Sequence, residues 1–346
     1  MSKVLLYLHM IAIALMTAMP SWALPLSSGD QIRVLIPEGE EFSGTYKLDV
    51  EGEINIPYLD PLPVRGLEPE IVELLLTRML VEEGFFQPEF LQVSVLVLER
   101  APVPITVSGA VFEPGRILIN NRSPEELASQ QNLVSGDNPQ GRYLTAALQA
   151  VGGVRPDAKL DEIRVIRGQT VEIFDLSGVF SGESVEDIPL ISGNRVEVPT
   201  VGYFQDELAR PSQITPPGIR IFLSNLTIPA NSNATSAIGR DATRFPYGSR
   251  LSQAVVAANC AGGTQATNAD RKVLLVGTDR LTGLTRAVER DIETLLSEPG
   301  DSKENPLLMP GDAVACYDST VTNARDVSRT ITDILSPFSI IIDWIF

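Results

Sequence analysis

Acidic side chains are the residues of this chain whose number and spacing most suggest chemistry. The sequence has 44 Asp and Glu against 27 Lys and Arg, and it contains the adjacent pairs Glu40-Glu41, Glu82-Glu83 and Glu125-Glu126. Two carboxylates that flank a glycosidic bond can hydrolyse it, one as general acid and the other as base or nucleophile. Adjacent residues of one element point to different faces, so these pairs fit a solvated surface better than a catalytic site.

The only histidine, His9, lies in a stretch that has the features of a secretory signal peptide. Residues 1–23 contain Lys3, an apolar run from Val4 to Met16, and the small-x-small sequence Ser21-Trp22-Ala23. An uncleaved N-terminal anchor is the alternative, although the run is short for a transmembrane helix. Cleavage would leave no histidine, and so no Ser-His-Asp or Cys-His group and no imidazole metal ligand. Since phosphate-loop and dinucleotide motifs are also absent, we predict no enzymatic activity, no metal and no cofactor.

The charge balance limits the partners of the chain. Without residues 1–23 it has 26 basic and 44 acidic side chains, a formal charge of −18. Binding to nucleic acid needs Lys and Arg that neutralise phosphates, and anionic lipid surfaces repel an acidic chain. We therefore predict no nucleic-acid partner.

Two cysteines, Cys260 and Cys316, are the remaining candidates for covalent chemistry. In an exported chain two thiols most simply form one disulfide. The alternative is two free, buried thiols. A bridge would close a loop of more than 50 residues, and its role would be structural.

Residues 28–100 have the pattern of a compact α+β unit. A turn at Gly29-Asp30 precedes an alternating strand over 32–36, and residues 45–58 are typical of a hairpin. A helix is predicted over 68–83, and a further strand over 90–98. The predicted core face of the helix consists of Ile71, Leu74, Leu75, Met79 and Leu80.

A second unit, residues 103–200, recurs in residues 214–318. The sequence LTAALQAVGGVRPDAKLDEIRVIRG from Leu144 aligns with LSQAVVAANCAGGTQATNADRKVLLVG from Leu251. VEIFDL from Val171 corresponds to AVERDI from Ala287, and the closing SGNRVEVP from Ser192 corresponds to PGDAVACY. The paired glycines of each copy follow short helices, so they fit helix C-terminal turns rather than phosphate loops. We predict two copies of one small domain.

The last stretch, residues 321–346, is amphipathic when placed on a helix. Fully helical, it would be about 39 Å long, longer than the roughly 30 Å hydrocarbon core of a bilayer. One copy would expose a polar stripe to lipid, so it could span only as one of several copies around water. The alternative is a helix folded back on its own domain. Ser336-Pro337 predicts a kink, and Trp344 has the position of an interface anchor.

The two faces of this predicted helix have opposite characters. The face expected to line a pore consists of Arg325, Arg329, Thr332, Ser336, Ser339 and Asp343. The face expected to meet lipid consists of Val327, Ile331, Ile334, Leu335, Phe338, Ile341, Ile342 and Ile345.

The opening unit resembles the polysaccharide export domain of Wza-type outer-membrane translocons. The residues that carry the resemblance are GDQIRVLIPEGEEFSGTYKLDVEGEINIPYLDPLPVRGLEPEIVELLLTRML and FLQVSVLVLE. The following ITVSGAVFEPGRILI and the AVGG sequence are similar to the SLBB β-grasp repeat that accompanies this domain. The fold class that follows is α+β: an export domain (28–100), two β-grasp-like SLBB domains (103–200 and 214–318) and a C-terminal amphipathic transmembrane helix (321–346).

The resemblance implies a function in transport. Members of this family form ring-shaped homo-oligomers, often octamers, and their C-terminal helices build a porin-like barrel through the outer membrane. Capsular or extracellular polysaccharide passes through the ring, and an inner-membrane co-polymerase contacts its periplasmic end. The expected localisation is the outer membrane, with most of the chain in the periplasm.

One departure from the family concerns membrane attachment. Wza-type members typically carry a lipidated N-terminal Cys, whereas the residue directly after Ala23 is Leu24 here. Membrane attachment would therefore depend on residues 321–346 alone. The alternative function is a periplasmic, monomeric glycan-binding protein without a pore. A carbohydrate-active enzyme is a third possibility, against which stand the missing histidine and the lack of a convergent carboxylate pair.

Overall fold

The computed structural model describes residues 24–123, 125–126, 137, 139–225, 244–260, 271–279, 283–297, 299–300 and 303–318. The described chain is a mixed α+β protein with several small sheets and few helices. It divides into two compact units: residues 1–106, 116–147 and 187–195 in one, and residues 107–115, 148–186 and 196–346 in the other. The predicted signal peptide and the predicted terminal helix both lie outside the described residues.

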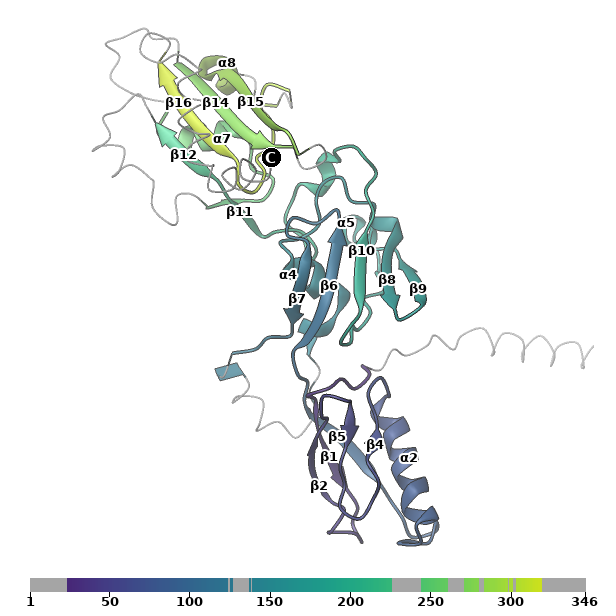
Figure 1. The fold of residues 1–346 in the computed structure, drawn as a ribbon. Helices are drawn as coiled ribbons and strands as arrows, with labels where there is room; N and C mark the ends of the chain where they lie inside the picture. The colour runs from purple at the N-terminus through teal and green to yellow at the C-terminus, as the bar shows by residue number, and fades with distance from the viewer. Residues whose placement is uncertain are drawn as a thin grey trace, which may run out of the picture. The chain divides into compact units, whose positions relative to one another are not determined.

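The N-terminal part of the first unit is a three-stranded antiparallel sheet with one helix (Figure 1). Strand β1 (Gln31–Leu35) pairs with β2 (Gly44–Lys47) on one side and with β5 (Ser94–Glu99) on the other. A short pair, β3 (Glu53–Ile54) with β4 (Leu62–Pro63), and helix α2 (Pro69–Glu82) complete this part. Ile32, Val34 and Ile36 are buried, as their alternation predicts.

Helix α2 corrects one prediction. Its buried residues are Val72, Leu76 and Leu80, whereas Ile71 and Leu74 are 42% and 65% exposed. The helix has apolar residues around most of its circumference, so residues at helical spacing define two different apolar faces, and the sequence does not show which of them is buried. Contact with β5 decides between them, because the face that packs on the sheet is the one that loses water.

The hairpin predicted over residues 45–58 is only partly correct. The turn at residues 49–53 forms, since the Asp49 carboxylate accepts the N–H groups of Gly52 and Glu53 at 2.9 and 2.8 Å. Beyond the turn, however, β3 pairs with β4 and not with β2.

A five-stranded sheet in the order β7-β6-β10-β8-β9 follows (Figure 1). Its strands are β6 (Val103–Gly109), β7 (Gly115–Ile119), β8 (Ile163–Arg167), β9 (Thr170–Phe174) and β10 (Arg195–Val198). Helices α4 (Leu144–Ala150) and α5 (Gly178–Ser181) and the 3₁₀ turns η1 (Gln140–Arg142), η2 (Leu160–Glu162) and η3 (Asp206–Leu208) connect these strands.

The last part of the chain repeats this order of elements. Strands β11 (Gly218–Arg220) and β13 (Arg244–Pro246) pair, and a four-stranded sheet has the order β12-β16-β14-β15. Its strands are β12 (Phe222–Asn225), β14 (Arg271–Thr278), β15 (Thr285–Asp291) and β16 (Ala313–Asp318), with helices α7 (Leu251–Ala257) and α8 (Ile292–Ser297).

The two copies correspond element by element. Helix α4 matches α7, the β8–β9 pair matches β14–β15, α5 matches α8, and the closing strand β10 matches β16. In the second copy, β11 and β12 together occupy the place of β6, and β13 occupies that of β7. The internal alignment made from the sequence therefore has a counterpart in the order of strands.

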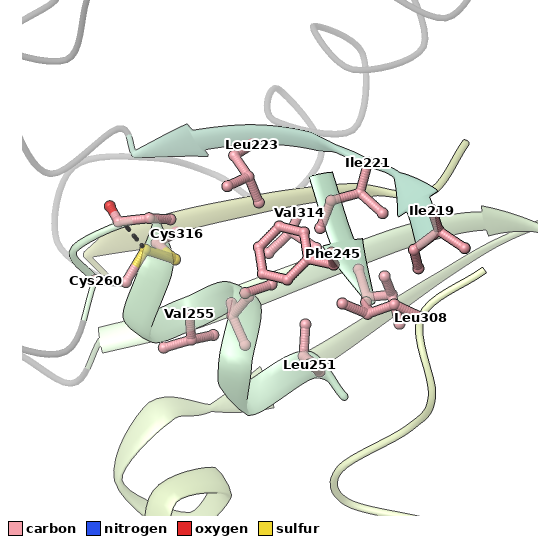
Figure 2. Close-up of a cluster of buried hydrophobic side chains, with 14 of the residues drawn as sticks. Ile219, Ile221, Leu223, Phe245, Leu251, Val255, Cys260, Leu308, Val314 and Cys316 are labelled. Atoms are coloured by element: carbon pink, nitrogen blue, oxygen red, sulfur yellow. Dashed lines mark hydrogen bonds between the residues drawn. A yellow bond between two sulfur atoms is a disulfide. The ribbon is translucent and has the colours of Figure 1, made fainter. Parts of the chain in front are cut away.

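The main core of the second copy is a cluster of buried side chains, and a smaller cluster on β14 and β16 consists of Leu274, Val276, Ala313, Ala315 and Tyr317. Ile219, Ile221 and Leu223 from the first strands meet Leu251 and Val255 of α7 (Figure 2). Leu308 and Val314 close the cluster, together with both cysteines. These aliphatic residues form the layer between α7 and the sheet.

Gly109 shows why the stretch after β6 needs glycine. Its φ is +91°, and a Cβ there would lie 2.0 Å from the Val198 carbonyl oxygen of β10. Ala110 N–H donates to that same oxygen at 2.8 Å. Glycine therefore allows β6 to approach β10 closely at the point where β6 ends.

Candidate functional site

The residues predicted to line a pore or to face lipid, all between Arg325 and Ile345, lie outside the described residues. Within the part of the chain that the structure describes, no helix combines the length and the apolar character needed to cross a bilayer. In the same part, no cluster of three His, Cys, Asp or Glu side chains is placed to hold a metal ion.

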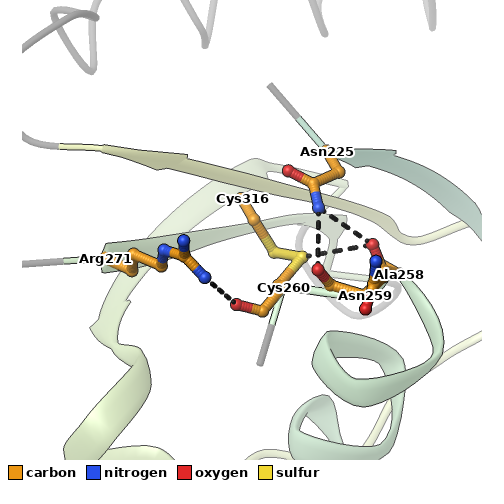
Figure 3. The surroundings of a disulfide bond; sticks show 6 residues. All are labelled: Asn225, Ala258, Asn259, Cys260, Arg271 and Cys316. Carbon is orange, nitrogen blue, oxygen red and sulfur yellow. Dashed lines mark hydrogen bonds between the residues drawn. A yellow bond between two sulfur atoms is a disulfide. The ribbon is translucent and has the colours of Figure 1, made fainter. Parts of the chain in front are cut away.

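Cys260 and Cys316 form a disulfide in the structure (Figure 3). Their Cα atoms are 6.0 Å apart, and both residues are buried. Cys260 follows α7 and Cys316 lies in β16, so the bridge ties the helix of the second copy to its closing strand.

Polar side chains order the backbone beside this bridge. The Asn225 amide donates to the carbonyl oxygens of Ala258 and Asn259 at 3.1 and 3.0 Å (Figure 3). Arg271 donates to the carbonyl oxygen of Cys260 at 3.3 Å. Asn259 has a φ of +54°, which Asn tolerates better than most residues. These bonds satisfy the carbonyl groups at the end of α7, so the bridge is part of a rigid, structural corner.

The largest polar group in the interior of the first unit is centred on Asp30. This carboxylate is fully buried and accepts bonds from Arg142 Nη1 at 2.9 and 3.1 Å and from Arg100 Nη1 at 3.1 Å. The backbone N–H groups of Ser27 and Ala101 donate to it at 2.9 and 2.8 Å. One acid therefore holds two buried guanidinium groups.

A second carboxylate extends this network. Asp137 accepts the N–H of Arg100 at 2.8 Å and a two-pronged bond from Arg122 at 2.9 and 3.0 Å. Burial lowers the pKa of the Arg100 and Arg142 guanidinium groups, and the charge of Asp30 opposes that shift. All five side chains belong to the first unit, so the network fixes segments distant in sequence within that unit.

Exposed aromatic side chains gather at one end of the three-stranded sheet. The buried Phe42 ring contacts the rings of Tyr58, Phe85 and Phe86 edge-on, with centroids 6.2, 5.0 and 5.8 Å apart. Tyr58 is 77% exposed and Phe85 is 45% exposed. We call Phe42, Tyr58, Phe85 and Phe86 the aromatic end.

The segments around the aromatic end are rich in acidic side chains, although Arg78 of α2 pairs with Glu82 at 2.7 Å. Residues 36–43, 55–61 and 81–91 contain no Lys, Arg or His. Their acidic residues, all exposed, are Glu38, Glu40, Glu41, Asp60, Glu82, Glu83 and Glu89. The pairs Glu40-Glu41 and Glu82-Glu83 thus belong to a solvated acidic rim, and the surface suits a partner with apolar and basic groups.

Comparison with known families gives this part of the chain an identity. The family model described as polysaccharide biosynthesis/export protein matches residues 20–98. Residues 20–98 are similar to the domain that polysaccharide biosynthesis/export proteins share. The match includes Asp30 and the whole aromatic end, and it confirms the resemblance stated for the opening unit. A search of curated proteins finds no match to the chain.

A surface hollow lies outside the export domain. It has a volume of 590 Å³ and is lined by residues 178–183, Val185 and residues 210–213. The Arg210 guanidinium lies over the Phe180 ring at 5.2 Å and donates to the Phe180 carbonyl oxygen at 2.6 Å. A ring, a cation and hydroxyl groups on one surface suit a polar ring-shaped ligand such as a sugar.

Sequence reasoning missed two features of the export domain. The sequence predicts only that Asp30 lies in a turn, because no local pattern indicates that Arg100 and Arg142 contact it. The aromatic end could have been predicted from the sequence GFFQPEF at 84–90. This segment follows the predicted helix and contains three aromatic residues, whereas surface connections usually contain few apolar residues.

Proposed function

We propose that this chain is the subunit of a ring-shaped homo-oligomer that exports capsular or extracellular polysaccharide across the outer membrane. The observation that carries the proposal is the match of residues 20–98 to the polysaccharide export family, which supports a role in polysaccharide export or transport. The family is one of export rather than catalysis, in agreement with the absence of histidine from residues 24–346.

Three further features support a conduit. The two small domains after the export domain share one order of elements, as expected for the paired SLBB domains of the resemblance. Residues 321–346 have the polar and apolar faces that a barrel of helices needs. Residues 1–23 have the features of a signal for export from the cytoplasm.

The aromatic end is the surface we assign to the inner-membrane co-polymerase. It exposes rings that a partner can cover, and its rim has seven carboxylates, of which Glu82 is paired with Arg78. An acidic rim repels an anionic polymer and attracts a basic protein surface. In this assignment the export domain forms the periplasmic entrance, and residues 321–346 form the exit.

Electron microscopy of the detergent-extracted, full-length protein tests this function. Rings with a central opening are the expected result, together with sedimentation of the protein with outer membranes. A monodisperse monomer that needs no detergent would contradict the proposal.

The surface hollow favours a second candidate, a periplasmic glycan-binding protein without a pore. Phe180 and Arg210 supply the ring and the cation that such a protein would use. In that case the full-length protein would be monomeric, and Phe180→Ala would weaken glycan binding measured by calorimetry. A ring whose assembly and export do not change with Phe180→Ala would exclude this candidate.

A further inference from the structure

The first copy of the repeated domain leaves both edges of its sheet exposed and apolar. In the order β7-β6-β10-β8-β9, the edge strands are β7 and β9. Leu118 in β7 is 52% exposed, and Val171 and Ile173 in β9 are 55% and 60% exposed. Proteins normally protect an edge strand with charge, proline or a covering element, because its unpaired N–H and C=O groups recruit further strands.

The second copy shows that protection at the counterpart of β9. Strand β15, the counterpart of β9, has Ala287 and Glu289 where β9 has Val171 and Ile173, and Glu289 is paired with Lys272. Strand β13, the counterpart of β7, pairs with β11 in a separate two-stranded sheet and contains Arg244 and Pro246. The four-stranded sheet of this copy has β12 and β15 at its edges, and β12 also exposes an apolar side chain, Phe222, which is 47% exposed. The two copies therefore differ at the edge formed by β9 and β15, so the fold itself does not require the apolar β9 edge of the first copy.

The exposed residues of the two edges point to the same side of the sheet. Ile119 in β7 and Phe174 in β9 are buried, so the alternate residues face away from the core. On the outer side β7 presents Arg116 and Leu118, and β9 presents Val171 and Ile173, followed by the exposed Asp175.

The directions of the strands allow one edge to join the other in a neighbouring copy. Strands β6 and β7 are hydrogen-bonded neighbours with a five-residue connection, which requires an antiparallel pair. Thr106 and Ala110 donate to Asn194 and Val198, so β6 and β10 are parallel. The antiparallel bridge Ala158–Thr200 and the Lys159–Pro199 bond show that the chain entering β8 runs antiparallel to β10. Since β9 is antiparallel to β8, it runs in the same direction as β10 and β6. Strand β9 therefore runs opposite to β7.

We infer that β7 of one copy pairs antiparallel with β9 of the next, so that the five-stranded sheets join edge to edge into a closed belt. The inference rests on the proposed ring. Because the two edges differ, the contact is head-to-tail, and such a contact closes into a ring when the rotation permits. Each copy would add a width of about 24 Å to the belt, at ~4.8 Å per strand.

One register satisfies both the apolar and the charged residues. If Leu118 lies opposite Ile173 of the neighbour, then Arg116 lies opposite Asp175, because antiparallel partners step in opposite directions. Arg116 has no ion-pair partner among the described residues. The belt would supply one, and it would cover Leu118 and Ile173 at the same time.

Cysteine cross-linking of the full-length protein in detergent tests this contact. The variant Leu118→Cys/Ile173→Cys should give a ladder of disulfide-linked multimers under mild oxidation, since opposite Cβ atoms lie about 4.5–5.5 Å apart. Each single variant should remain unlinked. The matched control is Arg244→Cys/Ala287→Cys, on β13 and β15 of the second copy, which should also remain unlinked.

The outcomes separate this inference from the proposed function. Rings seen by electron microscopy without a ladder would overturn the edge contact and leave the conduit standing. A ladder of equal strength in the control pair would also overturn it. Monomers in both measurements would overturn both the contact and the ring.

A second variant tests the edge without cysteine. Ile173→Lys places a charge on the edge, and should abolish rings while the melting temperature of the protein stays unchanged. Val50→Lys, at a site that is 83% exposed in the export domain, is the control and should leave rings intact. Rings in normal number with Ile173→Lys would overturn the inference.

Discussion

Asp30 is the residue on which the interior of the first unit most depends. Its carboxylate accepts bonds from two guanidinium groups and two backbone N–H groups, all of them out of contact with water. A buried ion pair gives little net stability, but removal of one partner leaves an uncompensated charge. In this network the loss of one acid leaves two such charges.

Asp30→Asn should therefore destabilise the protein by about 3–5 kcal/mol. The amide keeps the shape of the side chain but cannot neutralise Arg100 and Arg142. Urea denaturation followed by circular dichroism would measure the loss. Asp60→Asn, at an exposed position of the same domain, is the control, and an equal effect of both variants would contradict this account.

The Cys260–Cys316 bridge acts on the second copy of the repeated domain. It joins residues 56 apart in sequence, and in the chain-entropy account a loop of that length corresponds to about 4 kcal/mol. The variant Cys260→Ser/Cys316→Ser should lose stability of this order. Denaturation of the wild-type protein with and without a reducing agent should reproduce the difference, and no effect of reduction would argue against a stabilising bridge.

At the scale of elements, close approach between strands explains why particular glycines are needed. Gly109 and Gly193 both have positive φ, +91° and +87°, but only Gly109 faces a neighbour, the carbonyl oxygen of Val198. A side chain at Gly193 would meet nothing within 4 Å. A side chain at Gly193 would therefore cause backbone strain alone, whereas one at Gly109 would cause both backbone strain and a collision with a neighbouring strand.

Gly193→Ala should cost about 1–2 kcal/mol, the strain of an L-residue in the left-handed region. Gly109→Ala adds a collision with β10, and its loss should be larger by about 2 kcal/mol or more. Thermal denaturation of the two variants gives the comparison. Equal losses would mean that β6 and β10 can separate without cost.

A group of three side chains across β14, β15 and β16 responds to pH. Lys272 donates to Glu289 at 2.7 Å and lowers the pKa of that carboxyl, to which the Tyr317 hydroxyl also donates. Burial, together with Glu289, raises the pKa of the Tyr317 hydroxyl. The group is therefore complete near neutral pH, where Glu289 is ionised and Tyr317 is not.

The directions of the two pKa shifts set a lower and an upper pH limit for the stabilising contribution of this group. Because the pKa of Glu289 is lowered, its contribution is present above about pH 4.3 and is lost as the pH falls through the folded-state pKa. Because the pKa of Tyr317 is raised, its contribution is present below about pH 10 and is lost as the pH rises further. Tyrosine absorbance during an alkaline titration should show a late phase that Tyr317→Phe reduces. An unchanged late phase would contradict the assignment.

At the scale of the whole molecule, the proposed conduit depends on residues 321–346. Truncation after Thr320 should leave a protein that no longer partitions with membranes, because the only predicted membrane-spanning stretch outside residues 1–23 is removed. Fractionation of cells that express each form measures this directly. Equal solubility of the full-length and truncated proteins would contradict the pore-helix proposal.

Local pattern was sufficient for several features of the fold. Alternation predicted β1, since burial of Ile32, Val34 and Ile36 needs only a strand with one wet face. Self-similarity predicts a duplicated domain, which stays a prediction, and the described strands have similar orders in the two segments. The sequence also carried enough of the export-domain pattern for the family to be recognised over residues 20–98.

Other features depend on which segments meet in space. The burial of Val72 rather than Ile71 in α2 depends on the direction from which β5 approaches. The partner of β3 is β4, because pairing is decided by neighbours and not by the strand itself.

The chemistry of individual residues shows the same division. The sequence by itself determined the composition that speaks against catalysis, the repeat and the family of the first domain, since these depend on residue type and local order. Only the tertiary structure decided that Asp30 meets two arginines from residues 100 and 142, and that Leu118 and Ile173 lie on the two edges of one sheet. Such contacts join segments tens of residues apart, and burial and charge act on them only after the chain has folded.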